Sequence, residues 1–315
     1  MGAWLCQALL ERGAGVVSLD RPDAAREGRP STLRLLEIDT EVAEVEGDLV
    51  DPHVLHHTLL GYEVDTVFHL AAQTLVGAAA KSPASTFEVN VRGTWTLLDA
   101  CLQRGIERVL VASSDKAYGA HEELPYREDL PLRPTAPYEA SKAAADLIAR
   151  SYWHSYGLPV AVTRLANIYG GGDTNFSRLI PEAVCAALDG RRPVLRSDGS
   201  PERDFLYVED AAEAYLAIAD ALDRDEVRGE AFNAGGGRPY PVGEVVELIA
   251  RLAPTDVEPD IRGTANPPGE IDRQYLDATK IRTVIGWRPR FHLEAGLRRT
   301  IDWYRDHPEA RAPAS

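Results

Sequence analysis

The first half of the chain alternates continuous apolar runs with segments of helical spacing. Four apolar runs have the length of strands that are buried on both faces: 16–20, 66–70, 108–113 and 159–164. Residues 5–12 and 85–104 place apolar side chains three and four positions apart, which predicts helices. Buried strands separated by helices predict an α/β fold with a doubly wound parallel sheet.

The pattern changes after residue 165. Shorter helical segments are interrupted there by stretches rich in Gly and Pro, such as 170–173 and 235–241. We therefore expect a first domain at residues 1–165, with segments returning to it near 204–235. Residues 166–315 would form a smaller α/β domain that binds the substrate.

Composition limits the partners of this chain of 315 residues. Its net charge of −15 argues against nucleic acid and anionic membranes, because both require a basic surface. No apolar run reaches membrane-spanning length, and no signal peptide is visible. The three cysteines are widely spaced and lack any metal-ligand spacing. We expect a cytoplasmic protein with no metal, no nucleic acid and no membrane as partner.

Tyr138 and Lys142 are four residues apart, so a helix would place both side chains on one face. An ammonium at that place favours the phenolate, and lowering the pKa of a Tyr from about 10 to about 7 takes roughly 4 kcal/mol. Ser114 follows the apolar run 108–113 and would orient a substrate alcohol beside that phenolate. The Tyr-x-x-x-Lys pattern also occurs by chance in many helices, so it carries weight only together with other motifs.

Asp115 and Lys116 add an acid and a base directly after Ser114. An alcohol oxidation does not need them, whereas an elimination needs both. The alternative is a salt bridge, or two solvated charges at a strand end. To act, Asp115 must be protonated and Lys116 neutral. Their mutual attraction opposes this state and burial favours it, so we expect the pair to titrate as one coupled unit.

A dinucleotide-binding unit consists of a strand, a glycine-rich turn, a helix and a second strand that ends in an acidic residue. Asp20 ends the run 16–20 and has the position of that acidic residue, although it would also serve simply to end a strand. An acidic side chain there accepts hydrogen bonds from ribose hydroxyls and repels a 2′-phosphate, which favours NAD over NADP. Gly2 has the position of the last glycine of the turn. We expect a chain truncated at its N-terminus. The missing strand and turn would reflect either a misassigned start or a real loss of NAD binding.

Together these motifs resemble the extended short-chain dehydrogenase/reductase family, specifically its NAD-dependent nucleotide-sugar epimerases and 4,6-dehydratases. The segments that carry the resemblance are 47–49, 69–72, 90–94, 113–119, 138–142, 164–167, 170–173, 178–181, 203–210, 232–235 and 275–277. Each one is weak alone, and their order and spacing together are specific. The expected fold is therefore Rossmann-like with its first strand missing.

The resemblance implies a role for each site residue. Tyr138 would be the base on the sugar O4, Ser114 would hydrogen-bond O4, and Lys142 would hold the nicotinamide ribose. The residues implied to bind NAD, besides Tyr138 and Lys142, are Gly2, Asp20, Asp48, Leu49, Leu70, Ala71, Ala72 and Asn90. The residues implied to bind the nucleotide-diphosphate sugar are Asn167, Arg178, Arg203 and Arg273. Guanidinium forks match phosphate oxygens, although each Arg would also fit a surface ion pair.

The Asp115–Lys116 pair favours a nucleotide-hexose 4,6-dehydratase, which oxidises C4, removes water across C5 and C6, and returns the hydride to C6. The resemblance places this Asp-Lys pair, and the run 170–181, closest to the CDP-glucose type. The motif 203–210 is closer to the epimerases and dTDP-sugar enzymes, so the nucleobase stays open. The alternatives are a 4-epimerase like those acting on UDP-glucose, and a truncated non-catalytic homologue. The resemblance also implies a homodimer formed through the helix at 85–104 and the Tyr138 helix.

Overall fold

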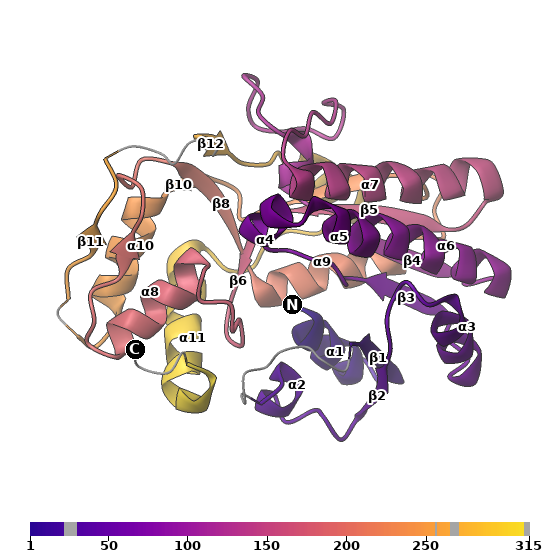
Figure 1. Cartoon of the computed structure of the whole chain (residues 1–315), viewed down its shortest axis with the longest axis horizontal. Coiled ribbons are helices and arrows are strands. Elements are labelled where there is room, and N and C mark those ends of the chain that lie inside the picture. The colour runs from indigo at the N-terminus through magenta and orange to yellow at the C-terminus, as the bar shows by residue number, and fades with distance from the viewer. Residues whose placement is uncertain (22–29, 256, 265–270, 312–315) are drawn as a thin grey trace.

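Figure 1 shows the structure of the chain, a computed structural model that describes residues 1–21, 30–255, 257–264 and 271–311. Its centre is a four-stranded parallel sheet in the order β3–β4–β5–β9. These strands span Thr66–His69, Arg108–Ala112, Val160–Leu165 and Ala231–Ala234. Every residue of β5 is buried, because helices cover both faces of the sheet. The predicted α/β fold with a parallel sheet and the three strands predicted at 66–70, 108–113 and 159–164 are confirmed.

Helices cover the two faces of this sheet from opposite sides. On one face lie α3, α6 and α7, which span Pro52–Gly61, Gly93–Arg104 and Pro137–Tyr156. On the other face lies α9, at Val208–Asp220, which packs against α1 at Gly2–Glu11. Successive residues of β4 point to opposite faces, so Val109 and Val111 enter one apolar core and Leu110 enters the other.

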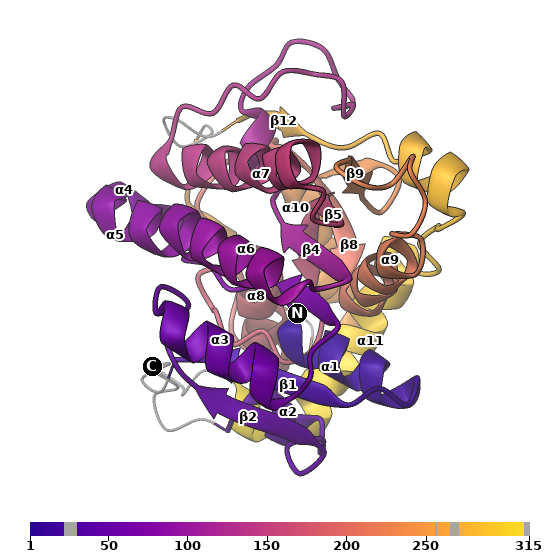
Figure 2. The same cartoon turned by 90° about the vertical axis from the view of Figure 1, so that its right-hand side faces the viewer.

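A second, smaller sheet holds the predicted strand at 16–20. It consists of β1 (Val16–Asp20) and β2 (Val42–Glu46), which pair in parallel so that Asp20 lies opposite Glu46. Figure 2 shows this pair below the four-stranded sheet. A cavity of about 950 Å³ is lined on one side by β1 and on the other by β3. The expectation about the start of the chain stays a prediction.

The helix predicted at 85–104 has three parts in the structure. The short helix α5 spans Pro83–Phe87, a π-helical turn η1 spans Glu88–Arg92, and α6 begins at Gly93. The π turn contains Asn90, which is buried and hydrogen-bonded to two neighbouring segments. The π turn continues directly into α6, so the sequence pattern predicted one helix and did not reveal the turn.

The second half of the chain is built around β8 (Glu202–Tyr207). This strand pairs in parallel with β6 (Asn167–Tyr169) and β12 (Arg273–Gln274), and antiparallel with β10 (Pro239–Pro241). Helices α8, α10 and α11 span Leu179–Leu188, Val242–Leu252 and Leu293–Asp306, and pack together around a separate apolar core. The domain boundary expected at 165/166 falls between β5 and β6 and stays a prediction.

Short elements complete the described chain. They are α2 (Thr32–Leu35), α4 (Val76–Lys81), β7 (Val194–Leu195), β11 (Asp260–Ile261), the 3-10 turns η2 (Asp115–Tyr118) and η4 (Pro308–Ala310), and the π turn η3 (Ile281–Ile285). Among the residues described, every helix is too short or too polar to span a lipid bilayer.

Candidate active site

Ser114, Asp115 and Lys116 lie where β4 ends and the 3-10 turn η2 begins. Ser114 is the cap of this turn, because its Oγ accepts a hydrogen bond from the Lys116 amide at 3.2 Å. The same hydroxyl donates to Asp115 Oδ1 at 3.0 Å. The three residues therefore stand at the carboxyl edge of the main sheet, which is the edge where ligands bind in open parallel sheets.

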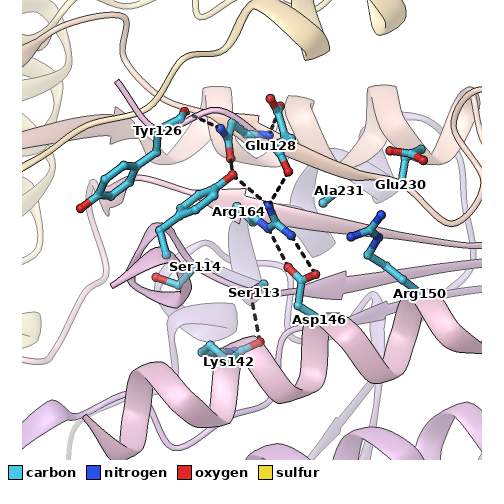
Figure 3. Close-up of polar contacts among 12 residues, drawn as sticks. Ser113, Ser114, Tyr126, Glu128, Lys142, Asp146, Arg150, Arg164, Glu230 and Ala231 are labelled. Atoms are coloured by element: carbon cyan, nitrogen blue, oxygen red, sulfur yellow. Dashed lines mark hydrogen bonds and ion pairs between the residues drawn. The ribbon is translucent and has the colours of Figure 1, made fainter. Parts of the chain in front are cut away.

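The helix α7 places Tyr138 and Lys142 beside this turn. The first turn of the helix is capped by Glu139, whose carboxylate accepts from the amides of Thr135 and Ala136. Lys142 Nζ donates to the carbonyl oxygen of Ala112 at 2.8 Å. Ser113 Oγ donates to the carbonyl oxygen of Lys142 at 3.2 Å, as Figure 3 shows. The end of β4 and the part of α7 that bears Lys142 are thus joined by two hydrogen bonds.

Burial dominates the electrostatics of Tyr138 and Lys142. Burial raises the pKa of Tyr138 to about 12, Asp115 acts in the same direction, and a hydrogen bond with Ser114 acts against it. Burial also lowers the pKa of Lys142 to about 8. Burial thus disfavours both the phenolate of Tyr138 and the ammonium of Lys142, and the stabilisation of the phenolate by Lys142 that the sequence predicts is not among the causes that set this pKa.

Asp115 has the protonation preference that a general acid needs. The side chain is 2 % exposed, and Oδ2 has no hydrogen-bond partner among the described residues. Burial raises the pKa of this carboxyl, while the charge of Lys116, the hydrogen bond from Ser114 and the charge of Arg203 oppose the rise. The net direction favours the protonated form of Asp115 relative to an exposed carboxyl. A coupled titration with Lys116 stays a prediction.

Gln274 is a site residue that sequence reasoning missed. It lies on β12, is fully buried, and accepts a hydrogen bond from Lys116 Nζ at 3.4 Å through Oε1. In the register of β12 with β8, Gln274 lies opposite Arg203, so these two side chains share a face. The sequence offered one signal for this residue. Gln274 directly follows Arg273, and neighbouring strand residues point to opposite faces, so only one of the two can face the site.

The predicted substrate arginines have different environments. Arg203 shares the face of Gln274 and is close enough to Asp115 to lower the pKa of that carboxyl. Arg178, at the start of α8, forms a 2.9 Å ion pair with Asp173. Arg273 lies opposite Glu202, forms a 2.8 Å ion pair with it, and has a side chain that is 56 % exposed. The structure therefore does not place Arg273 on the face of Arg203.

The predicted substrate contact Asn167 lies on β6, next to the same strand. Its Nδ2 donates to the carbonyl oxygen of Asp204 at 3.1 Å, which fastens β6 to β8. Asp204 itself is fully buried, and its Oδ1 accepts from the Gly236 amide at 2.8 Å.

Half of the ten residues predicted to bind the cofactor line the cavity of about 950 Å³. Those that do so are Gly2, Asp20, Leu49, Leu70 and Ala71. Asp48 forms a local turn instead, in which its Oδ1 accepts from the Val50 amide at 3.1 Å. Ala72 follows Ala71 directly on the loop after β3.

Asn90 has its hydrogen-bonding capacity taken up by the protein. Its side chain accepts from the Gln73 amide at 2.6 Å and donates to the Gln73 carbonyl at 3.0 Å. It also donates to Ser141 Oγ, on α7, at 2.8 Å. These contacts tie the loop after β3 to α7, so in this structure Asn90 positions two segments rather than presenting its amide to a ligand.

The cavity runs along the whole length of β1 and β3, and only its end at Gly2 and Asp20 offers groups that fit a dinucleotide. The ten-residue helix α1 begins at Gly2 without a side-chain cap, so its first amides are available to a phosphate. Asp20 ends β1 at the same edge of the fold, where a carboxylate suits ribose hydroxyls. Lys142 and Tyr138 stand at the end of β4, one strand beyond β3.

Comparison with known proteins relates this chain to nucleotide-sugar enzymes. The family model described as GDP-mannose 4,6 dehydratase matches residues 1–300. A dTDP-glucose 4,6-dehydratase of Xanthomonas campestris pv. campestris is 34% identical over 94% of this chain and 87% of that protein. A trifunctional UDP-glucose 4,6-dehydratase/UDP-4-keto-6-deoxy-D-glucose 3,5-epimerase/UDP-4-keto-L-rhamnose-reductase of Arabidopsis thaliana is 36% identical over 84% of this chain. The matched region is 39% of that plant protein, so the chain spans about two fifths of its length.

Solved structures of both reaction types are similar to the whole chain. A dTDP-glucose 4,6-dehydratase from Streptomyces venezuelae, solved with NAD bound, has a TM-score of 0.86 and 30% identity, covering 99% of this chain and 96% of that one. A UDP-glucose 4-epimerase from Thermotoga maritima, solved with UDP-glucose, has a TM-score of 0.88 and 26% identity, covering 98% of this chain and 96% of that one.

Proposed function

The chain belongs to the GDP-mannose 4,6 dehydratase family, and on that premise we propose that it is an NAD-dependent nucleotide-hexose 4,6-dehydratase, a lyase. The observation that carries the proposal is the Asp115–Lys116 pair beside Ser114 and Tyr138. Ser114 and Tyr138 suffice for oxidation of an alcohol carbon. Asp115 and Lys116 add the acid and the base that an elimination requires.

The cofactor that fits the site is NAD, which is bound in the dehydratase structure from Streptomyces venezuelae. When bound, it accepts a hydride from the sugar C4 and later returns it. Asp20 would hold the adenosine ribose, the first amides of α1 the pyrophosphate, and Lys142 the nicotinamide ribose. The nearby Leu49, Leu70 and Ala71 would supply apolar walls.

The protein's own side chains would carry the proton transfers. Tyr138 would remove the proton of the O4 hydroxyl as a phenolate, the form that burial disfavours in this structure, while Ser114 orients that oxygen. Lys116 then removes the C5 proton, and the electrons of the C5–H bond form the C5–C6 double bond. Asp115 gives its proton to the C6 hydroxyl, which leaves as water. Burial raises the pKa of Asp115, which favours the protonated form that this step needs.

The substrate class is a nucleotide-diphosphate hexose. Arg203 lies close to the acid–base pair, Asn167 lies on the neighbouring strand, and Arg178 is close enough to Tyr138 to lower the pKa of that phenol. By their names the dehydratase relatives act on dTDP-glucose or UDP-glucose. A preference for CDP-glucose stays a prediction. Activity measured on a panel of glucose substrates that carry different nucleotides tests which nucleobase the enzyme prefers.

The test of the reaction uses Lys116→Ala, with Lys81→Ala as its matched control at an exposed position on α4. The Lys116 variant should oxidise C4, seen as NADH absorbance, and release no 4-keto-6-deoxy sugar. The Lys81 variant should complete the reaction like the wild type. Dehydration by Lys116→Ala at the wild-type rate would show that the base is another residue.

The alternative function is 4-epimerisation. The observation in its favour is the TM-score of 0.88 with the UDP-glucose 4-epimerase from Thermotoga maritima. An epimerase returns the hydride to C4 and needs no acid or base at C5 and C6. Under this alternative, changing Asp115 or Lys116 would leave C4 chemistry complete, and the product would have the mass of the substrate.

We also propose a homodimer formed through α5, α6 and α7. These helices expose large apolar side chains on the surface: Phe87 at 40%, Trp95 at 42% and Leu147 at 57%. Figure 2 shows α6 next to α7, and the two helices are in contact. A second copy of the same face would cover these residues. Light scattering should give a dimer for the wild type and a monomer for Leu147→Glu. A cytoplasmic location stays a prediction.

A further inference from the structure

Gln274 contacts the proposed base from a strand of the second half of the chain. The side chain is fully buried, and its Oε1 accepts from Lys116 Nζ at 3.4 Å. Its Nε2 is buried without a hydrogen-bond partner among the described residues. A buried donor without an acceptor costs free energy, so the placement of an amide here points to a role beyond packing.

The position of Gln274 is fixed independently of Lys116. Its strand β12 pairs with β8, where Gln274 lies opposite Arg203. On the following residues, the Tyr126 amide donates to the Tyr275 carbonyl and the Asp277 amide donates to the Tyr126 carbonyl, both at 2.9 Å. The backbone contacts of β12 therefore fix the Gln274 amide, and this amide in turn holds the flexible Lys116 side chain.

The charged and titratable groups around the acid–base pair come from several elements. They are Asp115 and Lys116 in η2, Arg203 and Asp204 in β8, Tyr138 in α7, and Tyr126 in the loop before it. Gln274 differs from them because it is neutral at every pH. A carboxylate in its place would orient Lys116 equally well and would also stabilise the ammonium. An amide carbonyl orients the nitrogen without adding a charge that opposes deprotonation.

We propose that Gln274 is a positioning residue for Lys116, which holds the amine toward the sugar C5 and leaves it able to exist in its neutral form. This inference rests on the proposed dehydratase function, in which Lys116 takes the C5 proton. The step itself is unchanged: the proton moves from C5 to Nζ, and the C5–H electrons enter the C5–C6 double bond.

The first test is independent of catalysis. The sequence has four lysines, Lys81, Lys116, Lys142 and Lys280, so reductive ¹³C-methylation yields few enough NMR signals to follow each one, and Lys116→Ala identifies the relevant signal. In Gln274→Glu the titration midpoint of the Lys116 signal should rise by at least about one pH unit, as expected for a carboxylate within contact distance. The control Gln103→Glu makes the same exchange at an exposed position on α6 and should not move it. An unmoved midpoint in Gln274→Glu would overturn the proposal.

The second test is kinetic. Gln274→Met keeps the shape of the side chain and removes its carbonyl. Elimination, followed as exchange of the C5 hydrogen with solvent deuterium, should slow by roughly tenfold to a hundredfold, because a displaced base loses its alignment. C4 oxidation, followed as NADH absorbance, should stay within about twofold of the wild type, because this step uses Tyr138 and Ser114 and not Lys116. A parallel loss of both steps together with a lower Tm would show a merely structural role and overturn the proposal.

The two proposals fail in different ways. If the wild type forms only an isomer of its substrate, the dehydratase function has failed, and the NMR titration still decides whether Gln274 controls Lys116. If the wild type dehydrates its substrate and Gln274→Met exchanges C5 at the wild-type rate, only the role of Gln274 has failed.

Discussion

Arg164 holds both carboxylate oxygens of Asp146 inside the protein. Its Nε and Nη2 donate to Oδ2 and Oδ1 at 2.8 and 3.0 Å, and the two side chains are 1% and 0% exposed (Figure 3). Arg164 belongs to β5, and Asp146 lies one helical turn after Lys142 on α7. The helix that presents Tyr138 and Lys142 is thus fixed to the sheet by a buried ion pair, so the geometry of the site depends on this contact.

Breaking this pair from one side should destabilise the fold strongly. Asp146→Asn leaves a buried guanidinium without its counter-charge, which we expect to cost about 3–5 kcal/mol in the free energy of unfolding. The double variant Asp146→Leu, Arg164→Met should recover most of that loss, because no unpaired charge remains buried. Urea unfolding measures both. Glu294→Gln, which breaks an exposed ion pair with Arg298 on α11, is the control and should change little. Equal stability of Asp146→Asn and the wild type would show that the pair does not anchor α7.

Arg203 and Arg273 should differ in their effect on substrate binding. Arg203 shares a face with Gln274 beside the acid–base pair, whereas Arg273 pairs with Glu202 on the opposite face. We expect Arg203→Ala to raise the KM for the nucleotide sugar by roughly tenfold or more, the effect of losing a charged hydrogen bond. Arg273→Ala should raise it by less than about threefold. Steady-state kinetics measure both values, and a larger effect of Arg273→Ala would contradict the assignment of faces.

Asp204 should make stability depend on pH. Burial raises the pKa of this carboxyl to about 7, and Asp115 acts in the same direction, against a hydrogen bond from Gly236. Below about pH 4 the carboxyl is protonated in both the folded and the unfolded chain. As pH rises from about 4 to about 7, only the unfolded chain releases the proton, so the wild type loses stability in this window.

Asp204→Asn removes this titration and can keep the hydrogen bond from Gly236. The free energy of unfolding of the variant relative to the wild type should therefore increase from about pH 4 to about pH 7, by up to about 4 kcal/mol, and then level off. Denaturant unfolding at several pH values measures the difference. Asp198→Asn is the control of opposite sign, because hydrogen bonds from Ser200 lower the pKa of that exposed carboxyl. A difference that does not change with pH would contradict the raised pKa of Asp204.

The local patterns of this sequence predict local structure well. The runs around Val162 and Leu110 became buried strands, and Tyr138 and Lys142 share a buried helix face because a helix spacing of four requires it. The Ser114 turn was likewise predictable, since a polar residue directly follows a buried strand.

The features that sequence reasoning missed depend on pairing between distant segments. Gln274 reaches Lys116 only because β12 pairs with β8 in one register, and a shift by one residue would present Arg273 instead. Asn90 lies in a π turn whose hydrogen bonds to Gln73 and Ser141 join three segments. Burial, which sets the pKa of Tyr138 and Asp115, is also a property of the assembled fold.

The fate of the hydride decides the reaction. We would incubate the enzyme with NAD and nucleotide-glucose deuterated at C4, and analyse the sugar by mass spectrometry and NMR. A dehydratase built on Asp115 and Lys116 must give a 4-keto-6-deoxy sugar that is lighter than the substrate by one water and carries the deuterium at C6. A product of unchanged mass that carries the deuterium at C4 would contradict the elimination and identify the chain as an epimerase.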